Sequence, residues 1–443
     1  MKRFSLIVLL LYFIVAENGC STGPQPQPTA GVNCYFTQSN DLPQTQSAAK
    51  LAEFMSQEHL EYDLDGWFFF GSLVDSASPE APGMFISSMQ RIAKEWGGIR
   101  WQLIPAIIAY NGPSLEGYVF GGDFILEDLD PRVVVTSNPW KVTVNSSKQT
   151  EPLMTMSLVS GTMGQAGAEY LLTGNVPALQ GGTLEAEVLL CDRLGTVNQG
   201  YGSASFFPQY LTGLQQYDIK RSFGNSVKKY LESTGASMAG QGSFYYSLPL
   251  LDVKNFWIKR NGVLLSSGTS GTMWMDDIVQ SYGQEAQDVL IGKAWWEFYS
   301  IMLPEEDAAI MVIQIKSGTG TLPVATLFST SSERTSNSAR KPVHSWKIDE
   351  IGIEALSSGG VWTSPMTGNQ YVQERRIRLE SPDCQADLTV KMVREDQEIV
   401  VDMTAIGLNK TIKYEGLATV TGTLRGKPVR GTAVVELQPF GSQ

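Results

Sequence analysis

The feature that most constrains this 443-residue chain is a series of short apolar segments separated by turns that contain glycine or proline. Residues 183–188 alternate apolar and polar side chains strictly, as a strand with one wet face does. Residues 419–424 and 429–437 flank the turn at 425–428 and predict a hairpin. Many short strands with such turns favour β-barrels or sandwiches over a parallel α/β sheet. We therefore expect an all-β fold.

Further segments predict strands and a few short helices between them. The proline after residues 244–248 is expected to end a strand there, at Pro249. The remaining expected elements are an aromatic strand at 67–71, a strand, Gly/Ser turn and strand within 254–275, a hairpin of 295–301 and 308–315 around the turn at 304–307, and short helices near Ser47–Gln57 and Asp218–Ser233.

Length and composition bound the possible architectures and partners. A chain of 443 residues exceeds one ordinary core and suits two domains. Hydrophobic residues make up 42% and charged residues 18%, which is typical of a globular protein with a large core. The formal charge of -12 repels phosphate backbones, so no nucleic-acid partner is expected.

The N-terminal segment has the pattern of a secretory signal peptide. Two basic residues precede an apolar run at 4–16, which is too short to span a bilayer comfortably. We expect a signal peptide at 1–19 and a flexible leader at 20–45, with an uncleaved anchor as the alternative. The expected location is lumenal or secreted, and no stable membrane span is expected in the mature chain. Sequons at Asn145 and Asn409 fit glycosylation on that route.

The sequence lacks the residues that several common chemistries need. It has two histidines and no HExxH motif, which argues against a histidine-based zinc site. We find no GxxxxGK[ST] loop, no dinucleotide-binding glycine motif and no GxSxG elbow. Four cysteines form no CxxC motif, and one disulfide, such as Cys191–Cys384, is possible. No metal and no cofactor are therefore expected.

Aromatic and ionisable residues cluster in three segments instead. Residues 274–277 place two acids beside a tryptophan, at the end of a predicted strand. Residues 295–299 carry large rings on both faces of a strand, and residues 413–416 place ionisable groups just before the last hairpin. Rings supply a dry wall, and a buried acid or phenol can hold the polar group of a ligand. The partner expected from these segments is a hydrophobic small molecule.

These motifs, in this order, resemble a known family. Residues 274–277 resemble the W-M-D-H segment of the carotenoid hydratase/AttH-type lipocalin-like family, and 295–299 resemble its following W-D-W-F strand. Residues 361–371 resemble its W-T-S-P…Y segment, and 414–437 its closing Y-W-E-G…G-K-P-V…V-E-L segment. The resemblance implies two tandem lipocalin-like barrels or sandwiches, which we place at 46–290 and 291–443, with a ligand pocket between or within them.

One departure from the family pattern selects a branch. Asp277 stands where the W-M-D-H motif has histidine, and a hydratase needs a proton donor and acceptor at its alkene. The chain is more similar in character to the fungal lipocalin-like pericyclases, often called Diels–Alderases. Their reaction folds a linear polyene with a tetramic acid or pyrrolone head into a decalin or isoindolone during secondary-metabolite biosynthesis. The signal peptide and sequons fit a fungal glycoprotein.

A cycloaddition of this kind fits the residues that are present. It transfers no proton, and holding the reacting ends together can supply roughly 7–11 kcal/mol. A hydrogen bond to the conjugated carbonyl adds electrostatic stabilisation. We expect polar roles for Asp276, Lys413 and Glu415, and pocket walls from Trp67, Trp274, Trp296, Tyr299, Tyr371 and Tyr414. Alternation along a strand points Tyr414 away from Lys413 and Glu415, so these three are not expected to share one surface.

Two other functions are compatible with the same residues. A non-catalytic carrier of a hydrophobic small molecule would use the same aromatic walls, since fold does not settle function. An alkene hydratase or isomerase would use Asp276 and Asp277 as acid and base. Turnover distinguishes the carrier from the enzymes, and the loss of rate in Asp276→Asn distinguishes the hydratase from the pericyclase.

Overall fold

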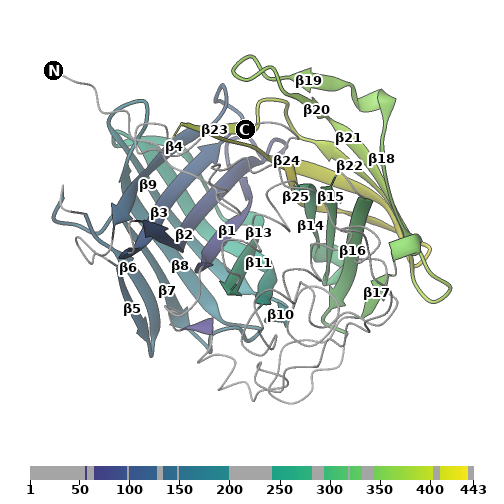
Figure 1. The fold of residues 1–443 in the computed structure, drawn as a ribbon, viewed down its shortest axis with the longest axis horizontal. Coiled ribbons are helices and arrows are strands. Elements are labelled where there is room, and N and C mark those ends of the chain that lie inside the picture. The colour runs from purple at the N-terminus through teal and green to yellow at the C-terminus, as the bar shows by residue number, and fades with distance from the viewer. Residues whose placement is uncertain are drawn as a thin grey trace, which may run out of the picture.

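The computed structural model contains two large antiparallel sheets that lie side by side, one from each half of the chain (Figure 1). The strands of the N-terminal half run from purple to teal in Figure 1, and those of the C-terminal half from green to yellow. The residues described by the structure are 55–56, 64–96, 99–126, 133–146, 149–198, 242–281, 294–317, 320–331, 343–346, 348–402 and 410–437.

The N-terminal sheet has thirteen strands and curls back on itself. Its main path is β4-β3-β2-β1-β13-β11-β9-β8-β7-β6-β5, with β10 and β12 paired to β11. β4 approaches β8 through an isolated bridge between Gly121 and Ala178, which nearly closes a barrel. The strands are β1 (Leu64–Val74), β2 (Gly83–Trp96), β3 (Ile99–Asn111), β4 (Val119–Leu126), β5 (Val133–Ser137), β6 (Trp140–Val144), β7 (Met154–Ser160), β8 (Glu169–Pro177), β9 (Thr183–Asp192), β10 (Val197–Asn198), β11 (Gly242–Arg260), β12 (Val263–Gly268) and β13 (Ser270–Ser281).

The C-terminal sheet has ten strands in the path β17-β16-β15-β14-β25-β24-β22-β21-β18, with β23 paired to β24. A separate hairpin of β19 (Val361–Thr363) and β20 (Gln370–Val372) lies beside it, with 3-10 turns η1 (Pro304–Glu306), η2 (Ile348–Glu350) and η3 (Ser357–Gly359). The strands are β14 (Ala294–Leu303), β15 (Ala308–Ser317), β16 (Gly320–Ser329), β17 (His344–Trp346), β18 (Ile351–Ala355), β21 (Glu374–Glu380), β22 (Gln385–Met392), β23 (Glu398–Asp402), β24 (Lys410–Leu424) and β25 (Lys427–Leu437).

The clearest sequence patterns form the elements they predicted. β9 buries every second side chain, as its alternation requires. β24 and β25 form the final hairpin, whose turn places Arg425 at φ 53° and Gly426 at φ 75°. Two consecutive positive φ values define the tight turn that matches the twist of antiparallel strands. β14 and β15 form the second predicted hairpin around η1. The all-β fold is confirmed, with two curled, nearly closed sheets.

Three expectations about local structure are wrong. Pro249 does not end its strand: β11 continues to Arg260, because the register with β13 shifts between Leu248 and Leu251 and a bulge accommodates the missing N–H. Residues 254–275 belong to three strands and not two: β12 gives way to β13 within the predicted Gly/Ser segment, and an additional turn at Asn261–Gly262, at φ 52° and 75°, separates β11 from β12. Residues 274–277 lie in the interior of β13, and not at its end.

Other expectations fall partly or wholly outside the described residues. These are the signal peptide, the leader, the helix at Asp218–Ser233, Asn409 and all but two residues of the helix near Ser47–Gln57. Asn145 directly follows β6 and is partly exposed. In the described part of the chain no helix is long and apolar enough to cross a membrane.

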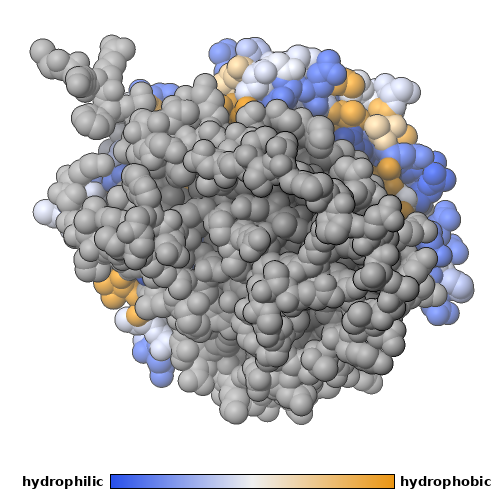
Figure 2. Space-filling view, viewed as in Figure 1, coloured by the Kyte–Doolittle hydropathy of each residue, from blue (hydrophilic) through white to orange (hydrophobic). Residues whose placement is uncertain are grey.

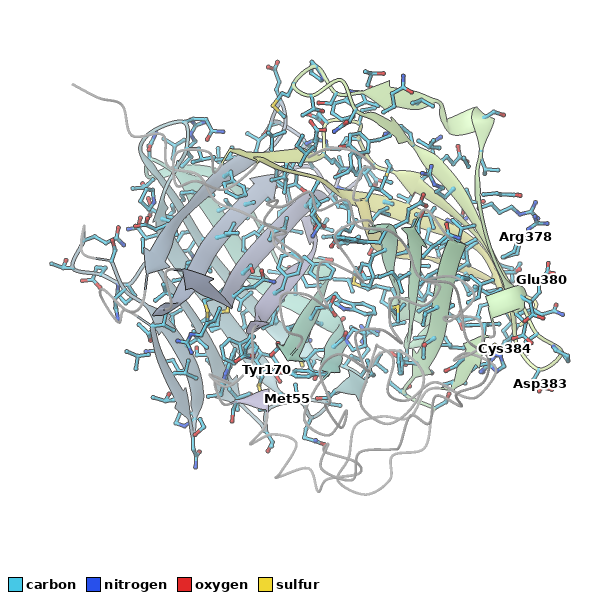
Figure 3. The ribbon with its side chains drawn as sticks, viewed as in Figure 1. Met55, Tyr170, Arg378, Glu380, Asp383 and Cys384 are labelled. Atoms are coloured by element: carbon cyan, nitrogen blue, oxygen red, sulfur yellow. The ribbon has the colours of Figure 1, made fainter. Side chains whose placement is uncertain are left out.

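The two cysteines that the structure describes do not form a disulfide. Cys191 lies on β9 of the N-terminal half, whereas Cys384 lies at the outer edge of the C-terminal half, beside Asp383 in Figure 3. Both thiols are free, so the Cys191–Cys384 pairing is wrong. The two residues belong to different sheets, and strand pairing does not bring these sheets' edges together.

The outer face of the C-terminal sheet is solvated. Arg376 Nη2 lies 2.6 Å from Asp387 Oδ2, and Arg378 Nη2 lies 3.0 Å from Glu354 Oε2. Figure 2 shows mainly hydrophilic surface along the edge of the C-terminal half, with scattered hydrophobic residues. Isolated apolar side chains are normal on a soluble surface. Most described apolar side chains of the C-terminal half are buried, with Val361 and Met366 as exposed exceptions.

Candidate functional site

Strands in the middle of the molecule are buried on both faces. In β1, Trp67 and Phe69 point into the core of the N-terminal barrel, together with Tyr170 and Met55, which are labelled in Figure 3. Phe68 is equally buried although it points the other way. Because β1 and β13 contact β25 and β14 of the other half, this second face packs against the C-terminal sheet.

The C-terminal sheet has the same two-sided burial. Tyr299, Tyr414 and Val435 belong to the core of the C-terminal barrel, whereas their strand neighbours are buried on the opposite face. We call the layer between the two sheets the seam. Its residues are Ser247, Phe68, Phe70, Trp274 and Asp276 from the first sheet, and Trp296, Phe298, Lys413, Glu415, Leu417 and Glu436 from the second.

A buried ion cluster forms the polar centre of the seam. Glu415 and Glu436 lie opposite each other on β24 and β25, and Phe298 of β14 lies opposite Glu436 on its other side. Lys413 Nζ lies 2.7 Å from Glu415 Oε1 and 2.7 Å from Glu436 Oε2. The Trp296 indole N–H donates to Glu436 Oε1. One ammonium thus faces two carboxyl groups, in a site where all three side chains are almost fully buried.

Burial and proximity change the protonation of this cluster. Burial raises the pKa of Glu415 well above its usual range, against the effect of Lys413, and Glu436 raises it further. For Lys413 burial lowers the pKa, but the two carboxyl groups outweigh it and the net shift is upward. The site therefore holds a fixed ammonium beside a carboxyl group that retains its proton to unusually high pH. Both can donate hydrogen bonds.

A second polar group lies on the first sheet. Asp276 lies opposite Ser247 across β13 and β11, and it accepts hydrogen bonds at Oδ1 from the Ser247 hydroxyl and the Trp274 indole N–H. The three side chains share one face, because Ser247 is the direct partner of Asp276 and Trp274 is two residues away on the same strand. Asp276 is a buried acceptor that is held in position by two donors.

Phe68 lies between the two polar groups. It is the β1 partner of Asp276, so the two side chains are cross-strand neighbours. Lys413 Nζ lies 5.9 Å from the centre of the Phe68 ring, at the outer limit of a cation–π contact. Phe70, 4.8 Å from Phe68 between ring centres, extends the aromatic wall and lies opposite Trp274. The seam thus combines an aromatic wall with polar groups from both sheets.

The structure brings five of the sequence-predicted site residues together and separates the others. Asp276, Trp274, Trp296, Lys413 and Glu415 lie in the seam. The other four point into barrel cores: Trp67 in the N-terminal barrel, and Tyr299, Tyr371 and Tyr414 in the C-terminal barrel. The phenol of Tyr371 donates to Glu398 and that of Tyr299 to Glu297, each at 2.7 Å.

Asp277 also lies away from the seam. It points to the other face of β13 from Asp276 and accepts hydrogen bonds from the Tyr246 hydroxyl and, at 3.3 Å, from the Gly66 N–H. Burial and the nearby charge of Asp65 raise the pKa of Asp277 well above its usual range. Asp276 and Asp277 are consecutive residues of one strand and cannot serve as the acid and base of one site.

Sequence reasoning missed Ser247, Phe68 and Glu436. The apolar run at 67–70 has no alternation, so it does not show which rings face the seam. Glu436 could have been identified from the predicted final hairpin, because the register of that hairpin places residues 415 and 436 opposite each other. Among the described residues, no cluster of histidine, cysteine, aspartate or glutamate is arranged to hold a metal ion.

No protein-family profile and no curated protein matches the sequence. Solved structures resemble it in fold, among them the following two. An AttH-like protein from Nitrosomonas europaea has 19% identity and a TM-score of 0.58, over 86% of this chain and 94% of that one. Kievitone hydratase from Nectria haematococca has 13% identity and a TM-score of 0.54, over 91% of this chain and 95% of that one.

The chain has the AttH-like fold. A structure of CghA with Sch210972 also aligns, with 12% identity over 86% of this chain and 89% of that one, but its TM-score of 0.48 is too low to establish a shared fold. The motif resemblance is thus confirmed for the fold. Because a fold does not by itself determine a reaction, the seam residues decide which chemistry this chain can support.

Proposed function

We propose that this protein is a cofactor-independent pericyclase that binds a hydrophobic polyene in the seam. The observation that carries the proposal is the contact of the Lys413 ammonium with the carboxyl groups of Glu415 and Glu436 within a buried aromatic layer. The proposed substrate has a conjugated carbonyl in a tetramic acid or pyrrolone head. Its product is a decalin or isoindolone of secondary metabolism.

The proposed chemistry uses position and hydrogen bonding. Lys413 and Glu415 donate hydrogen bonds to the conjugated carbonyl oxygen, where negative charge increases in the transition state. Phe68, Trp274 and Trp296 hold the diene and the dienophile in a folded conformation, so that two carbon–carbon bonds form in one step. No proton is transferred between protein and substrate. Loss of one such donor typically lowers kcat by about 10²–10³.

The direct test is to incubate the purified protein with a polyenoyl tetramic acid and with a polyenoyl pyrrolone. We expect faster ring formation and a changed ratio of stereoisomers relative to buffer, with both effects reduced in Lys413→Met. The matched control is Arg376→Met, which removes a surface cation of the C-terminal sheet. A rate and product ratio equal to those in buffer would exclude pericyclase activity on these substrates.

A second candidate is an alkene hydratase or isomerase. It is favoured by the raised pKa of Glu415, and kievitone hydratase shares the fold. In this mechanism Glu415 gives its proton to one alkene carbon, water adds to the other, and Glu436 takes the proton of that water. The pair differs from Asp276 and Asp277, which face opposite sides of β13. Incorporation of ¹⁸O from labelled water identifies a hydratase, because a cycloaddition incorporates none.

A carrier is the third possibility, and turnover separates it from both enzymes. A carrier binds the polyene and its cyclised product with similar affinity and leaves the reaction rate as in buffer. A pericyclase binds the folded transition state more tightly than the extended substrate. Equilibrium binding of substrate and product, measured beside the rate, therefore distinguishes the two.

A further inference from the structure

The seam is closed in this structure. Trp274, Asp276, Lys413 and Glu415 are each at most 1% exposed. A small molecule cannot reach these side chains unless the two sheets move apart or the chain that covers the seam is displaced. Polar contacts that join the two halves beside the seam therefore affect how readily it opens.

One such contact centres on Arg193, which directly follows β9. Its Nε and Nη2 donate to the two carboxylate oxygens of Asp252 on β11, at 3.1 and 2.6 Å, within the N-terminal half. Its Nη1 reaches the other half, where it donates to the Pro304 carbonyl at 2.6 Å and to Asp307 Oδ1 at 3.1 Å. The rigid fork of the guanidinium suits this role, since one edge binds Asp252 and leaves Nη1 for the second half.

Both sides of the Arg193 contact are fixed to strands. The Arg193 N–H donates to the Leu250 carbonyl at 3.0 Å, and the Thr330 N–H donates to the Asp307 carbonyl at 3.0 Å. Asp307 has φ 46° at the end of η1, a left-handed conformation that non-glycine residues rarely adopt. The turn between β14 and β15 thus presents Asp307 and the Pro304 carbonyl to one guanidinium.

The second contact centres on Arg394, between β22 and β23. Arg394 Nη1 donates to Asn111 Oδ1 and to the Gly112 carbonyl at the end of β3, and Asn111 Nδ2 donates back to the Asp396 carbonyl at 3.0 Å. Nearby, the Tyr118 hydroxyl donates to the backbone carbonyl of Glu415. These acceptors are uncharged, so salt weakens the contact less than an ion pair.

The two contacts differ in how easily they break. The Asp307 side chain is 52% exposed and that of Arg193 is 30% exposed, so water and salt compete for this pair. The contact around Arg394 has several reciprocal hydrogen bonds and includes the backbone of β24. The Arg193–Asp307 contact is therefore expected to break more readily than the contact around Arg394.

We propose that Arg193 and Asp307 form a releasable latch that controls access of an apolar small molecule to the seam, with the Arg394 contact as the hinge. The latch proposal depends on the proposed function in one respect, which is that the seam binds an apolar small molecule. The latch predicts that breaking the Arg193–Asp307 pair changes the rate of binding more than the affinity, because neither residue lies in the seam.

The experiment measures stopped-flow binding of N-phenyl-1-naphthylamine, a neutral apolar probe, by energy transfer from tryptophan. Asp307→Asn is expected to raise the association rate about threefold or more and to reduce its dependence on salt. Arg376→Met, which breaks an exposed ion pair remote from the seam, is the matched control and is expected to leave the rate unchanged. Equal rates in Asp307→Asn and wild type would overturn the latch.

A covalent lock gives the sharper test. Arg193→Cys with Asp307→Cys, in a Cys191→Ser background, places a thiol on each side of the latch. Because an arginine bridges a wider gap than two cysteines do, a reducible bis(methanethiosulfonate) linker joins the two thiols. The linked protein is expected to bind the probe at least about tenfold more slowly than the same protein after reduction, with the same circular dichroism spectrum. Equal rates before and after reduction would exclude the latch even though the seam binds the probe. Absence of binding in every variant would instead contradict the seam as a binding site, and the latch with it.

Discussion

Phe68 and Asp276 lie directly opposite each other on β1 and β13, and Lys413 of the other sheet lies over the Phe68 ring. One aromatic side chain thus contacts the polar groups that the two halves contribute to the seam. The arrangement depends on strand register in both sheets, because a shift of one residue would turn each of these side chains into a barrel core. The seam therefore forms only when the strands of both barrels are in register.

The first prediction concerns the two faces of β1. Phe68→Ala and Phe69→Ala remove the same ring from neighbouring buried positions, and each is expected to lower the free energy of unfolding by about 3–5 kcal/mol. Only Phe68→Ala is expected to change the binding of N-phenyl-1-naphthylamine, because Phe69 belongs to the N-terminal core. Urea unfolding and probe titration measure the two effects. Equal changes in affinity would place the binding site elsewhere.

The second prediction concerns the ammonium of the seam. Lys413→Met leaves Glu415 and Glu436 facing each other without their cation, and breaking a buried ion cluster in this way costs about 3–5 kcal/mol. Urea unfolding at neutral pH measures the loss. Raising the pH is expected to enlarge the loss, because the pKa of Glu415 is already raised by burial and the variant lacks the cation that favours its ionised form. A loss that is the same at every pH would mean that ionisation of Glu415 does not contribute to it.

The third prediction separates the two proposed reactions at Glu415. Glu415→Gln keeps a hydrogen-bond donor but has no proton to transfer. A pericyclase is expected to keep a substantial part of its rate, whereas a hydratase is expected to lose about 10²–10⁴-fold. The rate of each reaction against pH is the measurement. The pericyclase rate is expected to fall only as Glu415 loses its proton, at a pH well above the usual range for glutamate.

The fourth prediction concerns the pH dependence of stability at Asp277. Its pKa is raised in the folded protein, so the folded state binds the proton more tightly than the unfolded state, where the pKa is about 4. The stabilisation from this proton is complete below about pH 4 and is lost as the pH rises towards the folded pKa. Asp277→Asn is therefore expected to flatten the decline of stability above pH 4.

Asp387 provides a control, because its pKa shifts in the opposite direction to that of Asp277. Its hydrogen bond to Arg376 lowers the pKa of Asp387 in the folded protein, so its small contribution is present above about pH 4 and is lost as the pH falls. Urea unfolding between pH 3 and 8 compares Asp387→Asn and Asp277→Asn with wild type. A difference of the same sign for both variants would contradict the assignment of Asp277.

Local patterns predicted much of the fold, because alternation and turn residues act over a few positions. The alternating segment that became β9 and the turn at Arg425 and Gly426 are examples. The bulge after Leu248 could not be read from Pro249 alone, since a proline ends a strand or is accommodated within it according to the neighbouring strand. Pairing between residues distant in sequence decided that case.

The candidate site was predicted in part for the same reason. Motif resemblance selected Asp276, Lys413 and Glu415, and the structure places all three in the seam. It also selected Tyr371 and Tyr414, whose rings pack 4.7 Å apart between centres in the C-terminal core. A family motif contains residues of the barrel core as well as residues of the seam, so the motif alone does not separate the two groups. Only the tertiary structure assigns each ring to one face.

Burial of both faces in β24 has a consequence for insertions and deletions. Adding or removing one residue before Lys413 would send Tyr414 into the seam and turn the charged side chains into the apolar barrel core. Such a change would abolish the ion cluster and the core together, and no single compensating substitution would restore either. Length variation compatible with folding is thus confined to the turns, while point substitution at every second residue of the central strands can change the seam without disturbing the barrel cores.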